Sequence, residues 1–229
     1  MAYINRKESI TALFPGMPKY RLAQIEAALF DPAIRSWNEV STLPEKMRAI
    51  LSEKVPFISV SLGKLQAGDG GDTHKAAVTV DGDHSIETVL MKNKRGQYTI
   101  CVSSQVGCAM KCGFCATGKM GLIRNLDAEE IIDQFRFWKQ YLMDKLHPDA
   151  RISNIVYMGM GEPLANYQNV KESLNTILRQ SDIGKTRITV STVGVLPRLE
   201  QLLEDEEWPH VRMAVSLHSA DRATRKEIV

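Results

Sequence analysis

The sequence lacks any hydrophobic run long enough to cross a membrane. A spanning helix needs about 20 mainly apolar residues, and the longest apolar runs, such as residues 155–158, are far shorter. No apolar segment follows the basic residues Arg6 and Lys7, so a secretory signal is not indicated. Low-complexity tracts and repeats are also missing, which argues against collagen-like and coiled-coil proteins. These absences predict a cytoplasmic protein that does not contact a membrane.

Cysteine is scarce and confined to one place. The chain has 4 cysteines, and all of them lie between Cys101 and Cys115. Disulfide-stapled proteins carry cysteines spread along the chain, whereas a tight cluster without an export signal more often binds metal or performs redox chemistry. The cluster therefore predicts a metal or redox site.

Acidic residues are absent from Thr88 to Leu126, although the net charge of the whole chain is only +2. Six basic residues lie in this stretch: Lys92, Lys94, Arg95, Lys111, Lys119 and Arg124. One interpretation is a surface that faces nucleic acid phosphates. The other is an ordinary solvated face whose acidic partners come from elsewhere in the fold.

The composition is otherwise that of a globular protein, with 44% hydrophobic and 24% charged residues. A length of 229 residues fits one large domain, or a medium domain with a small partner. Helical periodicity predicts a small helical domain over residues 1–55, with Leu43-Pro44 as a helix start. Short β-prone runs at residues 58–62, 76–80 and 86–90 predict a small antiparallel sheet within residues 56–97. We expect a monomer.

Residues 98–229 alternate between strand and helix patterns. The expected strands are 98–103, 152–158, 187–192 and 211–217, and the expected helices begin near Asp127 and cover 170–180 and 196–206. Asp127 and Glu130 form a capping-box pattern, and an apolar stripe follows it: Ile131, Phe135, Trp138, Leu142 and Leu146. This alternation predicts a parallel α/β fold. Ligands bind at the carboxyl ends of such strands, so we expect the four loops there to converge on one site.

The number and surroundings of the cysteines in this loop limit which metal group it can bind. Cys108, Cys112 and Cys115 follow the first expected strand, with glycines among them that free the backbone to wrap a cofactor. Structural zinc takes four protein ligands, so a zinc site has to recruit Cys101 or a distant histidine. A four-iron cluster held by three cysteines leaves one iron open for a chelating substrate. Three ordinary buried cysteines fit less well, because glycine, lysine and polar residues surround them.

This loop resembles the RlmN/Cfr family of radical S-adenosylmethionine (SAM) adenine methyltransferases that act on 23S ribosomal RNA. The resemblance is strong from about Glu87 to the end and looser in the helical N-terminal part. It rests on four segments: residues 101–118, Gly159-Met160-Gly161-Glu162-Pro163-Leu164, Ser191-Thr192-Val193-Gly194 and Ser216-Leu217-His218-Ser219. The resemblance implies a partial parallel (β/α) radical SAM barrel of about four strands, with a small helical accessory domain that binds RNA.

The resemblance also implies a role for each of these residues. Cys108, Cys112 and Cys115 are expected to ligate a 4Fe-4S cluster, whose open iron binds the amino and carboxylate groups of SAM. The other expected SAM contacts come from three strand ends: Gly161 and Glu162, Ser191, and Ser216, Leu217 and His218. Glu162 offers an acceptor to the SAM ammonium, and the serines and His218 offer hydrogen bonds. A core histidine and a structural serine are the plainer alternatives for His218 and Ser191.

Two further assignments rest on resemblance alone. Cys101 matches the family's cysteine that releases a covalent enzyme–RNA intermediate by forming a disulfide, although a buried cysteine on a strand is normally structural. Glu87 matches the family's general base that removes the proton from adenine C2, although a lone glutamate in a β-prone run normally faces solvent. The implied partners are 23S rRNA, tRNA in some members, and an electron donor for the cluster.

In the family a cysteine near the C-terminus carries the methyl group. No cysteine follows Cys115 here, so we expect a truncated chain that is inactive in methyl transfer. Three alternatives stay open. One is methylation of adenine C8 by the same family, although Pro163 after Glu162 resembles the C2 type more. The others are a radical SAM enzyme with a non-RNA substrate and a zinc-dependent RNA-binding module.

Overall fold

Helices make up the N-terminal part of the chain, as the sequence predicts. The computed structural model describes residues 5–146 and 149–229. Its N-terminal part contains helices α1 (Arg6–Leu13), α2 (Lys19–Phe30) and α3 (Glu45–Lys54) and the short 3₁₀ helix η1 (Trp37–Glu39). These helices share a core of their own around the buried side chains of Ile25, Trp37 and Leu51. Pro44 directly precedes α3, which confirms the helix start expected at Leu43-Pro44.

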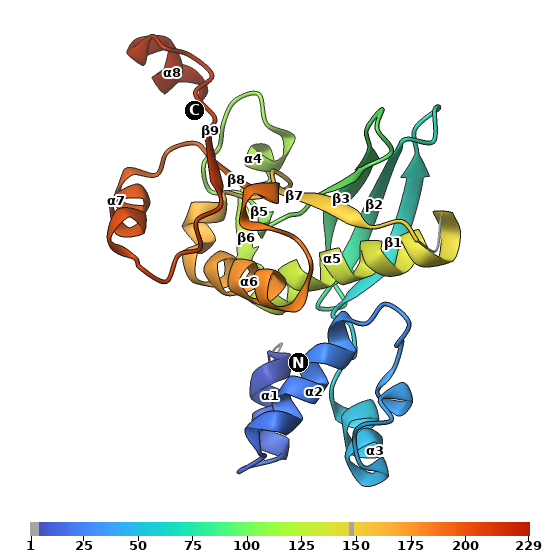
Figure 1. Ribbon diagram of the computed structural model, residues 1–229. Coiled ribbons are helices and arrows are strands. Elements are labelled where there is room, and N and C mark those ends of the chain that lie inside the picture. The colour runs from blue at the N-terminus through green and yellow to red at the C-terminus, as the bar shows by residue number, and fades with distance from the viewer. Residues whose placement is uncertain (1–4, 147–148) are drawn as a thin grey trace.

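Seven strands form one mixed sheet, in the order β1-β2-β3-β4-β7-β8-β9 (Figure 1). The strands are β1 (Val60–Ala67), β2 (Thr73–Val80), β3 (His84–Lys92), β4 (Tyr98–Cys101), β7 (Ile152–Tyr157), β8 (Ile188–Thr192) and β9 (Arg212–Val215). Neighbouring strands from β1 to β4 are antiparallel, and those from β4 to β9 are parallel. The predicted parallel α/β fold is thus confirmed. The expected small antiparallel sheet is continuous with the parallel one, because β3 pairs with β4.

The connections between the parallel strands are mostly helical. They are α5 (Ala128–Tyr141) with the π-helical turn η2 (Leu142–Leu146), η3 (Pro163–Asn166) with α6 (Tyr167–Gln180) and η4 (Lys185–Arg187), and α7 (Leu196–Glu204). Helix α8 (Arg222–Ile228) follows β9. A separate hairpin of β5 (Gln105–Gly107) and β6 (Leu122–Asn125) encloses the short helix α4 (Ala116–Met120). Neither the hairpin nor α4 and α8 was expected from the sequence.

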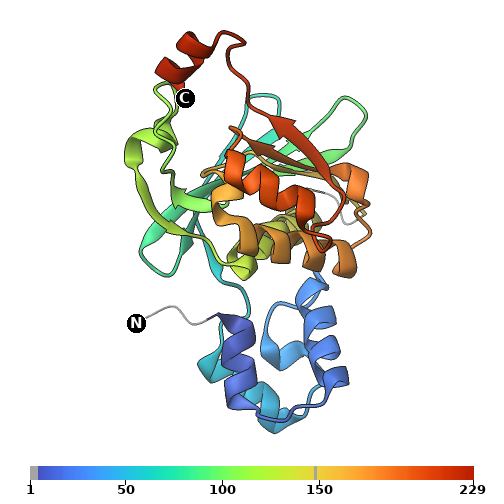
Figure 2. The ribbon, with the colours of Figure 1, turned by 90° about the vertical axis from the view of Figure 1, so that its left-hand side faces the viewer.

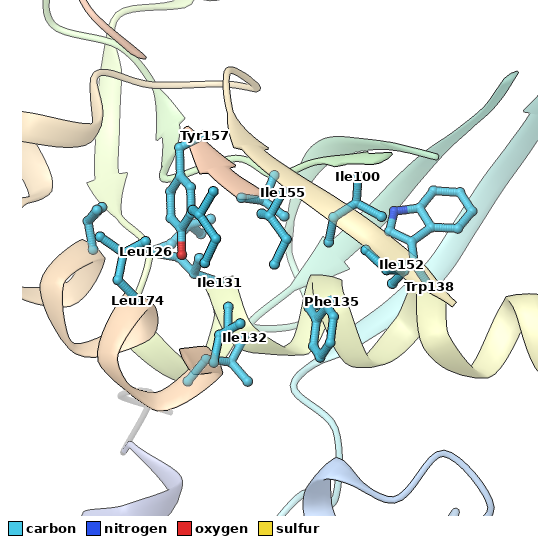
Figure 3. Packing of buried hydrophobic residues seen from close by; sticks show 14 of the residues in the cluster. Ile100, Leu126, Ile131, Ile132, Phe135, Trp138, Ile152, Ile155, Tyr157 and Leu174 are labelled. Atoms are coloured by element: carbon cyan, nitrogen blue, oxygen red, sulfur yellow. The ribbon is translucent and has the colours of Figure 1, made fainter. Parts of the chain in front are cut away.

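The main core lies between the sheet and helices α5 and α6. Figure 3 shows Ile100, Ile155 and Tyr157 of the sheet facing the α5 side chains Ile131 and Phe135, and all five are buried. Helix α5 begins as predicted, with a capping box between Asp127 and Glu130 and an Asp127 amide that donates to the Glu130 carboxylate at 3.0 Å. The stripe is one residue shorter than expected, because Leu146 lies in the π-helical turn and is exposed.

A buried carboxylate joins the helical N-terminal part to the main core. Asp133 of α5 accepts hydrogen bonds from the guanidinium groups of Arg6 and Arg136. It also accepts two from Ser59, one from the backbone amide and one from the hydroxyl, both at 2.6 Å. Arg136 also donates to the carbonyls of Leu29 and Phe57. Since α1 and the segment before β1 meet at this carboxylate, and α2 is tied to it through Arg136, Asp133 fixes how the N-terminal helices sit on α5.

Membrane-spanning helices are not found among residues 5–146 and 149–229, because each helix there is too short or too polar to cross a bilayer.

Candidate active site

The cysteine loop follows β5 rather than a strand of the main sheet. The Cys108 amide donates to the Gly121 carbonyl at 2.9 Å, and the Cys115 amide donates to the Cys112 carbonyl at 3.0 Å. Gly107 has a φ of +76°, and a Cβ there would lie 1.8 Å from the Gly121 oxygen. Only glycine can therefore start this loop.

The three loop cysteines form a group of thiols shielded from solvent. Cys108 and Cys112 are buried and Cys115 is half-buried. Burial raises the pKa values of the Cys108 and Cys112 thiols, and the neighbouring Cys115 raises both of them further. The positive charge of Arg225 acts in the opposite direction on Cys112. The three thiols therefore lie in one loop, close enough for the charge of one to disfavour ionisation of the others.

Glu162 joins the loops that follow β7 and β8. It is 3% exposed, and its carboxylate accepts hydrogen bonds from the amides of Leu164 at 3.0 Å and Val193 at 2.9 Å. Its own amide donates to the side-chain carbonyl of Gln105 at 2.8 Å. The carboxylate is therefore held in one orientation at the carboxyl ends of the parallel strands.

The loops after β8 and β9 also touch each other and the cysteine loop. The hydroxyls of Ser191 and Ser216 are 3.0 Å apart. The ring of His218, a residue with φ of +59°, packs on Phe114 of the cysteine loop with ring centres 4.5 Å apart. Leu217 lies between Ser216 and His218 and is exposed. The structure thus brings together the four loops that the sequence places at strand ends.

Glu87, Cys101 and Ser191 share the sheet face opposite the helices. On one side, Cys101 lies opposite Val89, which is two residues from Glu87 on β3. On the other side, Cys101 lies opposite Val156, and Val156 lies opposite Thr189, which is two residues from Ser191 on β8. Residues directly opposite, or two apart along a strand, point to the same face. Glu87 is exposed and pairs with Lys75 at 2.6 Å. Cys101 is half-buried, and burial raises the pKa of its thiol to about 11.

The basic stretch from Lys92 to Arg124 does not gather at these loops, which favours the second of the two interpretations, an ordinary face whose acidic partners come from elsewhere in the fold. Lys92 opposes Tyr98, which lies at the amino end of β4, so Lys94 and Arg95 in the following turn lie away from the strand carboxyl ends. The Arg124 guanidinium is bound by the carboxylates of Glu130 and Asp81, both at 2.7 Å. Its acidic partners come from outside the stretch. Only Lys111 and Lys119 lie in the cysteine loop or next to it.

Comparison with known proteins agrees with this geometry. A family model described as "Radical SAM superfamily" matches residues 102–229, which include the cysteine loop and the three other strand-end loops. The chain belongs to the radical SAM superfamily.

Individual radical SAM proteins are similar over nearly the whole chain. Two curated relatives carry the name "Probable dual-specificity RNA methyltransferase RlmN". The one from Dictyoglomus thermophilum is 41% identical over 93% of this chain and 60% of its own length. The one from Chlorobium phaeobacteroides is 37% identical over 99% of this chain and 64% of its own length. These relatives confirm the resemblance to RlmN proteins. The chain spans about 60% of the length of such relatives.

A solved structure shows that the fold is shared too. The crystal structure of a radical SAM methyltransferase from Sphaerobacter thermophilus superimposes with a TM-score of 0.86 at 34% identity, covering 99% of this chain and 65% of that chain. The predicted partial barrel with a helical N-terminal part is thus confirmed as a radical SAM fold.

The thiols of this radical SAM chain have the number and type that a cluster needs. Cys108, Cys112 and Cys115 lie in one loop, and in a four-iron cluster each thiolate binds a different iron. Among the described residues, no group of three Cys, His, Asp or Glu side chains is placed to hold a single metal ion.

Four polar residues that sequence reasoning did not identify hold the radical SAM loops together. The Ser103 hydroxyl donates to the Glu87 carbonyl at 2.6 Å and accepts from the Met160 amide at 2.8 Å. Gln134 exchanges hydrogen bonds with the Ser103 backbone, and Asn166 donates to the carbonyls of Ser104 and Leu126. Gln105 supports Glu162 as described above. The sequence does mark such residues in one way: a polar residue stands where the pattern of the element calls for an apolar one. Gln134 in the buried part of α5 is an example.

A cavity of about 880 Å³ lies away from this site. It is lined by residues of α1, α2, α5 and α6, among them Ile25, Phe30, Ile132 and Glu172. None of the predicted site residues lines it. It is the seam between the N-terminal helices and the main core, whereas the chemistry-bearing side chains meet at the strand ends.

Replacing Gly161 by alanine is expected to strain the loop after β7. Gly161 has a φ of +99°, and a Cβ there would lie 2.5 Å from the Cβ of Gln105 and 2.8 Å from its backbone nitrogen. We expect Gly161→Ala to lower the free energy of unfolding by about 1–3 kcal/mol, measured by urea denaturation. Gly184→Ala is the control, since its φ is −76° and nothing lies within 4 Å of its Cβ position. Equal stability of the two variants would contradict this close packing.

Proposed function

We propose that this chain is the cluster-binding and SAM-binding part of an enzyme that methylates C2 of an adenine in 23S rRNA, and in tRNA. The observation that carries the proposal is the contact between four strand-end loops, one of which bears three cysteines. Similarity to proteins named as dual-specificity RNA methyltransferases supports the RNA substrate. Since the chain spans about 60% of their length, methyl transfer belongs to the whole enzyme, and cluster and SAM binding to these residues.

Cys108, Cys112 and Cys115 are the proposed ligands of a 4Fe-4S cluster. When bound and reduced by an electron donor, the cluster supplies the electron that splits SAM into methionine and a 5′-deoxyadenosyl radical. The protein has to provide three thiolates, although burial raises the pKa values of Cys108 and Cys112. Metal binding displaces those protons, so loading is expected to be favoured at higher pH.

The neighbouring loops are proposed to hold SAM. The buried Glu162 carboxylate is fixed by two backbone amides and offers its remaining acceptor positions to the SAM ammonium. Gly161 lets the backbone come close, and the paired hydroxyls of Ser191 and Ser216 can turn to donate or accept. Leu217 and His218 are proposed to line the same SAM site, where the His218 ring packs on Phe114.

Glu87 and Cys101 are proposed to act on the RNA side of the reaction. Both lie on the sheet face that the helices leave uncovered, and Glu87 is exposed there as the partner of Lys75. We assign Glu87 as the base that removes the proton from adenine C2. We assign Cys101 as the cysteine that releases the RNA by forming a disulfide with the methyl-carrying cysteine of the whole enzyme. Because burial raises the pKa of Cys101 to about 11, its thiol must pass a proton to a base first.

Reductive cleavage of SAM tests the proposal with the chain as it exists. The protein is reconstituted anaerobically with iron and sulfide, mixed with SAM and a chemical reductant, and assayed for 5′-deoxyadenosine. We expect 5′-deoxyadenosine with wild-type protein and none with Glu162→Ala, which removes the fixed carboxylate. A reconstituted chain that holds a full cluster and leaves SAM intact would refute the proposed function.

A further inference from the structure

Helix α8 lies beside three loops of the candidate site. Asp221 caps the start of helix α8, and its carboxylate accepts hydrogen bonds from the amide and the hydroxyl of Thr224, both at 2.8 Å. At its other end, the Ile228 carbonyl accepts a hydrogen bond from the Gly113 amide in the cysteine loop at 3.0 Å. Figure 2 shows α8 beside the segment that contains this loop. The helix is thus anchored on the loop that carries the cysteines.

Arg225 uses this placement to join two other loops. Its guanidinium donates to the carbonyl of Val193, in the loop after β8, and to the carbonyl of Leu217, in the loop after β9, the latter at 3.2 Å. The Arg225 side chain is half-buried, and hydrogen bonds from a charged donor are stronger than neutral ones. Val193 also donates its amide to Glu162. Arg225 therefore acts on the loops of Ser191, Glu162, Ser216 and His218 without belonging to any of them.

Arginine is the side chain that suits this position. The two carbonyls lie on different loops, so a single donor group has to reach both. The planar guanidinium presents several N–H groups in a fixed fork, whereas lysine presents one compact ammonium. Helix α8 also meets the cysteine loop at Gly113, the residue directly after Cys112.

We propose that Arg225 is a positioning residue of the SAM site, which clamps the loops after β8 and β9 so that their polar groups face bound SAM. This inference rests on the proposed function, since it concerns the same SAM site. It adds a residue from outside the four motifs, one that holds their spacing rather than contacting SAM.

The test compares Arg225→Ala and Arg225→Lys with Arg222→Ala. Arg222 lies on the same helix, is exposed, and makes no hydrogen bond or ion pair within the described part of the chain. Each reconstituted protein is assayed for iron and sulfide content, and for its SAM dissociation constant by equilibrium dialysis with labelled SAM. We expect unchanged cluster content in all of them and SAM binding about tenfold weaker in both Arg225 variants, because a charge-assisted bridge is lost. Arg222→Ala is expected to bind SAM like wild type.

The outcomes separate this inference from the function on which it rests. If Arg225→Lys binds SAM as tightly as wild type, the proposed clamp is wrong, because a positive charge without the guanidinium fork would then be enough. Loss of the cluster in the Arg225 variants also overturns it, since the residue would then support the cysteine loop instead. If Arg225→Ala does not fold, Arg225→Lys carries the test. A wild-type chain that holds the cluster but binds no SAM refutes the proposed function and the clamp together.

Discussion

Cys112→Ala is expected to abolish cluster binding. The substitution leaves only Cys108 and Cys115 in the loop, and a cluster that already has one open iron cannot be held by two thiolates in a loop that offers no histidine or carboxylate in place of the third. The expected change is from a full four-iron cluster to almost no bound iron or sulfide after anaerobic reconstitution and desalting. The brown colour and its visible absorbance are expected to disappear with it.

Cys101→Ala is the matched control for this result. Cys101 is also a partly shielded thiol, but it lies on β4, and its carbonyl is bound by the Thr88 hydroxyl at 2.8 Å within the sheet. We expect the control to keep the whole cluster. A Cys112→Ala protein that still holds four irons, or a Cys101→Ala protein that holds none, would show that the ligands have been misassigned. Circular dichroism checks that both variants are folded.

Asp133→Ala is expected to cause the largest loss of stability. The Asp133 side chain is fully buried between Arg6 and Arg136, so its removal leaves two buried guanidinium groups without their shared counter-charge. Breaking a buried ion pair by removing one partner costs about 3–5 kcal/mol. The free energy of unfolding, measured by urea denaturation, is expected to fall by this amount, and the N-terminal helices are expected to become more susceptible to proteolysis.

Asp144→Ala provides the control for Asp133. Asp144 also links the N-terminal part to the α5 segment, through Arg35 at 2.7 Å, but its side chain is 49% exposed. Exposed ion pairs contribute only about 0–1 kcal/mol. If the two variants lose similar stability, Asp133 is not the junction that the structure indicates.

The same carboxylate makes stability depend on acid. Burial alone raises the pKa of Asp133, but the charges of Arg136 and Arg6 and hydrogen bonds from Arg6 and Ser59 outweigh it and hold the pKa at about 2, against an ordinary value of 3.8. A carboxyl group with a lowered pKa stabilises the fold above its ordinary pKa, and this contribution is lost as the pH falls toward the folded value. The wild-type chain is therefore expected to lose stability between about pH 4 and pH 2, and Asp133→Ala to lack this component of the loss.

Much of the architecture follows from local sequence patterns. The stripe of Ile131, Phe135 and Trp138 after a capping box predicts α5, because both signals lie within a few turns of helix. The alternation of strand and helix places the four loops at one end of the sheet, where Glu162 and Val193, and Ser191 and Ser216, are found in contact. These features depend on residues close together in the chain.

Contacts between residues that are far apart in the chain could not be predicted from the sequence. The positions of Lys92 and Arg95 relative to the cysteine loop depend on β3 being antiparallel to β4, and the partners of Arg124 come from a turn 43 residues away and from α5. Arg225 belongs to no recognisable motif, and its role depends on how α8 is placed against the loops after β8 and β9. Ser103 and Gln105 are likewise ordinary polar residues until the loop that they support is in place.

Electron paramagnetic resonance of the reduced, reconstituted chain with and without SAM tests the central claim most directly. The claim is that Cys108, Cys112 and Cys115 hold a four-iron cluster whose open iron faces the loops of Glu162, Ser191 and Ser216. It predicts a four-iron signal that changes when SAM is added. A four-iron signal that SAM leaves unchanged, or a chain that binds zinc tightly and forms no cluster, would contradict it.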